Sequence, residues 1–245
     1  MICKVIVLVI LVCFIYRLAF TEGYYDKGRI SKIIHQQGPA DIKKWHPDWS
    51  KYHRTWIEHF PESEYKHMLW NDDSIRELVK SEYQWLLPYY DGLNKNIMRY
   101  DVSRLLMLHK YGGIYADLDM EVHQNFYDKL SPNLPNIVGS NISSDKGVQN
   151  SLMASPPGHP FWLEVISDII NNPKLYEKTD ALEGIVVIDG TGPGRISKTI
   201  LRLNQPFRTL NANQYNHPKV FFKNKYATHK YTGVWKSKDN RNYVA

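Results

Sequence analysis

Residues Asn96–Val122, NIMRYDVSRLLMLHKYGGIYADLDMEV, form the stretch around which the rest of the chain is organised. The apolar residues of its first half recur at the spacing of one helix face: Ile97, Met98, Val102, Leu105, Leu106 and Leu108. Asp101 and Arg104 are three residues apart, so they leave this helix as neighbours on a different face. The pair Gly112-Gly113 predicts the end of the helix, because glycine tolerates the left-handed conformation of a C-cap.

A short buried strand is predicted directly after these glycines, over Ile114–Ala116. Asp117 and Asp119 follow at a spacing of two, and a pleated strand end would place both carboxylates on one side. Two carboxylates in that arrangement can hold Mn²⁺ or Mg²⁺, because such hard cations prefer oxygen ligands. A cation there would neutralise a departing diphosphate as a Lewis acid. We therefore predict Asp117 and Asp119 as the catalytic, metal-binding pair, and Asp101 with Arg104 as a grip on sugar hydroxyls.

Plainer interpretations of the same residues remain open. A D-x-D sequence can be a polar strand end, and Asp101–Arg104 can be a surface ion pair that contributes less than about 1 kcal/mol. A phosphatase-type nucleophile motif is disfavoured, because Met120 breaks the required order and no later acidic pair is visible. A membrane-anchored sugar-binding or structural protein on an inactive transferase scaffold is a further alternative. The presence of every motif carboxylate argues against that alternative.

The run from Arg99 to Asp119, RYDVSRLLMLHKYGGIYADLD, resembles the signature of glycosyltransferase family 32, the DXD sugar-binding family. The resemblance extends roughly from Ile30 to Trp235. It implies an α/β fold of the GT-A type, with a mainly parallel sheet flanked by helices. It also implies a metal-dependent, retaining transfer of a hexose, foremost mannose, from a GDP- or UDP-hexose to an acceptor hydroxyl on a glycan or glycolipid.

Outlying segments carry further parts of this resemblance. The strand predicted over Ile30–Gln36, ISKIIHQ, is similar to the family's opening strand, with Ser31 in place of the usual proline. In the family this strand begins the nucleotide-binding half, which would place His35 and Gln36 near the base or ribose. An ordinary polar strand end is the alternative for this pair.

Three later blocks also look like family segments. VQNSLMASPPGHPFW, residues 148–162, resembles a block whose asparagine, here Asn150, lies by the donor sugar. IDGTGPG, residues 188–194, resembles a family segment before a helix, although it also suits a tight strand-to-helix loop. The closing pattern suggests His229 as a metal ligand or diphosphate contact and Trp235 beside the nucleotide.

The remaining pattern alternates strands with helices, which argues for an α/β domain whose sheet is mainly parallel. Ligands of such sheets bind at the carboxyl ends of the strands, where Asp117 and Asp119 are expected. Strands are expected at Tyr65–Trp70, Asn133–Gly139, Val148–Ala154 and Val220–Tyr226, and helices at Asp73–Lys80, Glu82–Tyr90, Phe161–Asn171 and Arg195–Leu203.

Composition fits one globular domain, with 245 residues of which 43% are hydrophobic and 23% charged. Both cysteines, Cys3 and Cys13, lie in the N-terminal apolar segment, so the body can form no internal disulfide. From Lys219 onward there are seven basic residues and one acidic residue, which equals the whole net charge of +6. This basic C-terminal tail is expected to be solvated, to meet anionic lipid, or to cover a nucleotide diphosphate.

The N-terminus suggests attachment to a membrane. Val5–Phe20 is almost purely apolar but shorter than the roughly 20 residues that span a bilayer comfortably. We expect residues 1–22 to be an uncleaved signal anchor, an apolar helix, and residues 23–245 to be the catalytic domain. In a eukaryotic host this gives a single-pass type II protein with a lumenal domain, where the sequon at Asn141 could be used. No nucleic-acid partner is expected.

Overall fold

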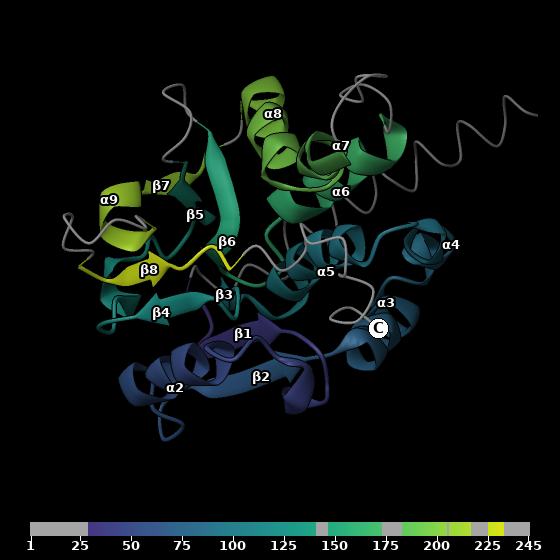
Figure 1. The fold of residues 1–245 in the computed structure, drawn as a ribbon. Helices are drawn as coiled ribbons and strands as arrows, with labels where there is room; N and C mark the ends of the chain where they lie inside the picture. Colours follow the sequence, from purple (N-terminus) through teal and green to yellow (C-terminus); the bar gives the residue numbers. More distant parts are fainter. Residues whose placement is uncertain (1–28, 141–146, 173–182, 205, 217–224, 233–245) are drawn as a thin grey trace, which may run out of the picture.

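The computed structural model describes residues 29–140, 147–172, 183–204, 206–216 and 225–232 (Figure 1). The elements follow one another in this order: β1 (Ile33–Gln37), η1 (Ile42–Lys44), α2 (Trp49–His59), β2 (Lys66–Trp70), α3 (Asp72–Glu82), η2 (Gln84–Leu86), α4 (Leu87–Gly92), α5 (Asn96–Tyr111), β3 (Gly113–Ala116), β4 (Met120–Val122), η3 (Tyr127–Lys129), β5 (Asn136–Gly139), β6 (Val148–Ser155), α6 (Phe161–Asn171), α7 (Glu183–Gly190), α8 (Pro193–Leu203), β7 (Arg208–Leu210), α9 (Ala212–Tyr215) and β8 (Ala227–His229). The alternation of strands and helices confirms the predicted α/β class.

Six strands form the main sheet in the order β2-β1-β3-β6-β5-β7. β1 is parallel to β2 and β3, and β5 is parallel to β7, whereas β6 runs antiparallel to both β3 and β5. The sheet is therefore mixed, with three of its five pairings parallel. A second, two-stranded sheet joins β4 to β8 in antiparallel register and sets Met120 opposite His229.

Buried apolar side chains pack on both faces of the main sheet. Ile114 and Ala116 belong to one cluster, which they share with α2, β4 and α9. Tyr115 points to the other cluster, which contains the buried faces of α3, α5, α6 and α8. This division follows from the alternation of side chains along a strand. In Figure 1, α2 lies with β1 and β2 in the lower part of the view, whereas α6, α7 and α8 lie in the upper part.

The connection from α5 to β3 is a single residue, Gly112. Gly112 ends α5 with φ 63° and Gly113 begins β3 with φ 91°, conformations that favour glycine. A Cβ on Gly113 would lie 2.4 Å from the carbonyl oxygen of Ile33, so β1 and β3 approach closely because this side chain is absent. The predicted helix, its glycine stop and the buried strand are all confirmed.

Several local expectations were wrong. Ser81 does not end α3 but lies inside it, with its hydroxyl donating to the carbonyl oxygen of Glu77 at 2.8 Å. Glu82–Tyr90 is not one helix: a 3₁₀ turn precedes α4, and Pro88 lies in the first turn of α4, where its missing N–H costs nothing. The glycine-rich segment at 188–194 connects two helices, α7 and α8, rather than a strand to a helix.

Some expectations fall outside the described residues. They are the apolar anchor at 1–22, the sequon at Asn141, most of the strand expected at Val220–Tyr226, Trp235, and the tail beyond residue 232. The described strand nearest to Val220–Tyr226 is β8, which begins at Ala227, one residue after the expected strand ends. Among the described residues, no helix has the length and apolarity needed to cross a membrane.

The tight α5–β3 connection predicts a large effect of Gly113→Ala. The substitution imposes a left-handed conformation on alanine and a clash with the β1 backbone, so we expect a loss of about 2–4 kcal/mol in the free energy of unfolding. Gly92→Ala, where a Cβ would meet nothing within 4 Å, is the control and should stay within about 0.5 kcal/mol of wild type. Equal effects of the two substitutions in denaturant titrations would contradict the interpretation.

Candidate active site

Arg104 on α5 lies at the centre of the candidate site and is 3% exposed. Its Nη2 is 3.3 Å from Asp101 Oδ1, and its Nη1 is 3.3 Å from Asp117 Oδ1. Nη1 also donates to the carbonyl oxygen of Asn150 at 2.9 Å, and Nε donates to that of Tyr100 at 3.2 Å. The alternative of a surface ion pair is therefore wrong, because the guanidinium and both of its carboxylate partners are part of one largely buried network.

Asp101 is held from both sides. Its Oδ1 accepts from the Asn150 amide at 2.8 Å, and its Oδ2 accepts from the Thr191 hydroxyl at 3.0 Å. Burial raises the pKa of this carboxyl to about 6, against the attraction of Arg104. Both oxygens of Asp101 thus already accept from protein groups, and its predicted contact with a sugar hydroxyl stays a prediction.

Asp117 is positioned by a turn and not by a strand pleat, which corrects the sequence-based expectation. β3 ends at Ala116, and the Met120 N–H donates to the carbonyl oxygen of Asp117 at 3.0 Å to close the turn. The Asp117 side chain is 27% exposed, and its Oδ1 accepts from the Tyr115 hydroxyl at 2.6 Å. Burial raises the pKa of the Asp117 carboxyl although Arg104 opposes the shift.

Asp119 is held by His229, the last residue of β8, and by Thr232 in the segment that follows β8. His229 Nε2 lies 3.1 Å from Asp119 Oδ1, while the backbone N–H and hydroxyl of Thr232 donate to Oδ2 at 3.0 and 3.1 Å. Trp49 on α2 in turn donates to the Thr232 hydroxyl at 3.3 Å. Although burial alone would raise the pKa of Asp119, the hydrogen bonds from His229 and Thr232 hold it below its usual value.

Asp117, Asp119 and His229 fit a divalent cation. One ligand atom from each lies within 4.8 Å of the others. His229 Nδ1 is buried and has no hydrogen-bond partner among the described residues, so no described protein group competes with a cation for this nitrogen. Two carboxylates with one imidazole form a donor set that suits Mn²⁺ better than Mg²⁺, because Mg²⁺ favours oxygen ligands alone.

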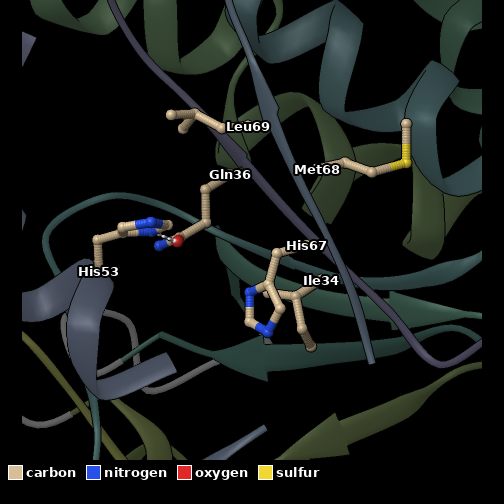
Figure 2. Close-up of a pocket in the computed structure, with 6 residues that line it drawn as sticks. All are labelled: Ile34, Gln36, His53, His67, Met68 and Leu69. Atoms are coloured by element: carbon tan, nitrogen blue, oxygen red, sulfur yellow. Dashed lines mark hydrogen bonds between the residues drawn. The ribbon is translucent and has the colours of Figure 1, made fainter. Parts of the chain in front are cut away.

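His35 and Gln36 lie on opposite faces of β1. His35 is fully buried: its Nδ1 accepts from the Trp70 indole at 3.1 Å, and its Nε2 donates to the Gly112 carbonyl oxygen at 2.9 Å. Gln36 points to the other face, and Figure 2 shows its side chain next to His53; its Oε1 accepts from His53 Nδ1 at 2.6 Å beside a cavity of about 10 Å³. The structure does not bring either side chain to the Asp117–Asp119 cluster, and their contact with a nucleotide stays a prediction.

The next residue of β1 does reach the cluster. Gln37 Nε2 donates to the Tyr115 hydroxyl, which in turn donates to Asp117. Sequence reasoning missed Gln37, Tyr115, Thr191 and Thr232. The polar end of a buried strand was a signal for Gln37, and the threonine within the glycine-rich segment was one for Thr191. No local pattern marks Thr232, because its partner Asp119 is distant in sequence. Trp235 lies outside the described residues.

The arrangement defines a class of protein. Transferases of the GT-A type carry a D-x-D turn at the carboxyl edge of a mixed α/β sheet, and this chain has both features. The solved structure of the PaToxG glycosyltransferase shares the fold, with a TM-score of 0.53, 17% identity, and coverage of 78% of this chain and 76% of that one. At that identity the likeness supports the fold alone.

Sequence comparison points to the same kind of enzyme. Residues 46–137 match the family model described as "Glycosyltransferase sugar-binding region containing DXD motif", in agreement with the resemblance seen in the sequence. Inositol phosphoceramide mannosyltransferase 3 of Schizosaccharomyces pombe is 36% identical over 140 residues, 57% of this chain and 37% of that protein. Mannosyl phosphorylinositol ceramide synthase CSH1 of Saccharomyces cerevisiae is 34% identical over 181 residues, 73% of this chain and 45% of that protein. The chain thus spans less than half the length of these relatives.

Removing the buried guanidinium of Arg104 should destabilise the fold. Arg104→Leu leaves Asp101 and Asp117 without their counter-charge, so we expect a loss of about 3–5 kcal/mol in the free energy of unfolding. Adding Asp101→Asn should restore part of that loss. Arg76→Leu, which breaks the exposed Arg76–Asp91 pair, is the control and should cost less than about 1 kcal/mol. Denaturant titrations giving the same small effect for both arginines would refute the central role of Arg104.

His35 predicts a pH dependence of stability. Burial lowers its pKa from 6.5 to about 4, and protonation would also set an Nδ1–H against the Trp70 indole N–H. The unfolded chain therefore takes up the proton first, and the stability contributed by neutral His35 is complete above pH 6.5 and lost as the pH falls towards 4. The loss is on the order of 3 kcal/mol. The free energy of unfolding of wild type minus that of His35→Gln, measured in denaturant from pH 7 to 4.5, should show this decline. A difference that does not change with pH would exclude it.

Proposed function

We propose that this chain is a metal-dependent, retaining glycosyltransferase that moves a mannosyl residue from a nucleotide sugar to an acceptor hydroxyl. The observation that carries the proposal is the convergence of Asp117, Asp119 and His229 beside the buried network of Arg104. The match to the glycosyltransferase family model supports a glycosyl transfer, and the names of two relatives, a mannosyltransferase and a mannosyl phosphorylinositol ceramide synthase, support mannose as the transferred group. Retention of anomeric configuration rests on the resemblance to family 32, and no side-chain nucleophile is assigned.

Asp117, Asp119 and His229 would hold the cation, and the donor set favours Mn²⁺ over Mg²⁺. When bound, the ion supplies charge neutralisation for the diphosphate that leaves with the nucleotide. The protein holds the two carboxylates in place beforehand, since Tyr115 and Arg104 contact Asp117 while Thr232 contacts Asp119. Pre-oriented ligands of this kind need no reorganisation when charge develops.

Asn150 is the residue of the buried network that we assign to the donor sugar. Because Asp101 Oδ1 accepts from Asn150 Nδ2, the amide oxygen of Asn150 points away from Asp101 and can accept from a sugar hydroxyl. Asp101 and Arg104 set this orientation, the first through the side chain of Asn150 and the second through its carbonyl oxygen. In this proposal they position the sugar contact as well as contributing to it.

The donor is proposed to be GDP-mannose, with UDP-galactose and UDP-glucose as the competing candidates. The acceptor is proposed to be a glycan or a glycolipid, because the name of one relative contains inositol phosphoceramide and that of another contains phosphorylinositol ceramide. A lipid acceptor would agree with the proposed N-terminal anchor and a lumenal catalytic domain.

The test is release of nucleotide by the full chain from GDP-mannose, UDP-galactose and UDP-glucose, with and without Mn²⁺. We expect Mn²⁺-dependent turnover of GDP-mannose, and a loss of at least about 100-fold in kcat/KM in Asp119→Asn. Asp91→Asn, at an exposed ion pair remote from the cluster, is the matched control and should retain activity.

The outcomes separate the parts of the proposal. Turnover of a UDP-sugar instead of GDP-mannose would replace the donor and keep the transferase. A folded wild-type chain that turns over no donor, and whose melting temperature no donor shifts in the presence of Mn²⁺, would refute the transferase and favour a non-catalytic scaffold.

A further inference from the structure

Tyr115 is a fully buried residue of β3 whose hydroxyl reaches the candidate metal cluster. The Arg104 guanidinium lies 4.9 Å from the centre of its ring. Its hydroxyl has two neighbours at hydrogen-bond distance, Asp117 Oδ1 at 2.6 Å and Gln37 Nε2 at 2.8 Å. A hydroxyl carries one proton, so the network around Gln37 decides which neighbour receives it.

The orientation of the Gln37 amide follows from its other contacts. Gln37 Nε2 donates to the carbonyl oxygen of Tyr100 at 3.1 Å, since that oxygen can only accept. Gln37 Oε1 is thereby turned towards the Ser103 hydroxyl, which lies 2.8 Å from it and 2.9 Å from the Tyr100 carbonyl oxygen. The second amide hydrogen of Gln37 is therefore directed at the Tyr115 oxygen.

The proton of the Tyr115 hydroxyl must then go to Asp117. Accepting from Gln37 leaves the hydroxyl free to donate in one direction only, and Asp117 Oδ1 is the acceptor in reach. Gln37 and Tyr115 thus form a chain of hydrogen bonds in which Gln37 donates to Tyr115 and Tyr115 donates to Asp117.

We propose that Tyr115 is a positioning residue for the metal site, which orients Asp117 so that Oδ2 faces the cation. This inference rests on the proposed function. Asp117 Oδ1 contacts Tyr115 and Arg104, which leaves Oδ2 as the oxygen that remains for a cation held together with Asp119 and His229. Outer-shell hydrogen bonds of this kind fix the orientation of a ligating carboxylate, and their loss typically weakens metal binding about 10–100-fold.

The experiment measures Mn²⁺ affinity of the full chain by the electron paramagnetic resonance signal of free Mn²⁺. Tyr115→Phe keeps the buried ring and every metal ligand, and we expect its dissociation constant to rise about 10–100-fold. Tyr83→Phe is the matched control, because the buried Tyr83 hydroxyl contacts His109 Nδ1 at 2.7 Å and the Leu106 carbonyl oxygen, with no link to Asp117. Tyr83→Phe should lose about as much thermal stability as Tyr115→Phe and keep the Mn²⁺ affinity of wild type.

A double substitution shows whether Tyr115 acts through Asp117. In the Asp117→Asn background, Tyr115→Phe should change Mn²⁺ affinity no further. An unchanged affinity of Tyr115→Phe alone, or an equal loss in both backgrounds, would overturn the positioning role while leaving the transferase intact. A wild-type chain that is folded and binds no Mn²⁺ would overturn the metal-dependent function, and the positioning role with it.

Discussion

The buried guanidinium of Arg104 is the constraint on which the candidate site depends. A cation taken out of water must be matched by opposite charge and by hydrogen-bond acceptors, or it costs several kcal/mol. Here each nitrogen of the guanidinium has an acceptor, contributed by α5, β6 and the turn after β3. Three nearby carboxylates, Asp101, Asp117 and Asp119, exceed this one cation, so the cluster retains negative charge when all three are ionised. In the proposed function, that excess of negative charge is what would attract a divalent cation.

The two glycines after α5 make this matching possible. Arg104 lies on α5 and Asp117 directly follows β3, and their side chains meet because only Gly112 separates the helix from the strand. Gly112 ends the helix with a positive φ that favours glycine, and Gly113 lets β3 lie against the backbone of β1. The same close approach sets Tyr115 beside Gln37, so one pair of glycines brings both the central cation and the hydrogen-bond chain to Asp117.

Local patterns were sufficient to predict α5, β3 and the D-x-D pair, since helix periodicity, glycine stops and strand alternation all act between near neighbours. They could not decide which residue of the polar strand end faces the site. A shift of one position moves a side chain to the opposite face, so Gln37 reaches Tyr115 while Gln36 lies beside His53. Local patterns also could not show that Asp101 and Arg104 are buried, because a charged pair with the same spacing occurs on exposed helices too. Thr232 and its bond to Asp119 depend on the pairing of β4 with β8, which no local pattern encodes.

The two carboxylates of the D-x-D turn are therefore held by different parts of the molecule. Asp117 is bonded to the interior of the main sheet, through Tyr115 and Arg104, whereas Asp119 is bonded to the segment after β8 and through Thr232 to α2. In the part of the chain that the structure describes, β8 has three residues and pairs with the short β4. Separation of β8 from β4 would therefore displace His229 and remove the contacts of Asp119 with His229 and Thr232, while Asp117 kept its contacts with Tyr115 and Arg104. The completeness of the ligand set thus depends on the docking of a short strand, and a cation bound by all three residues would stabilise that docking in turn.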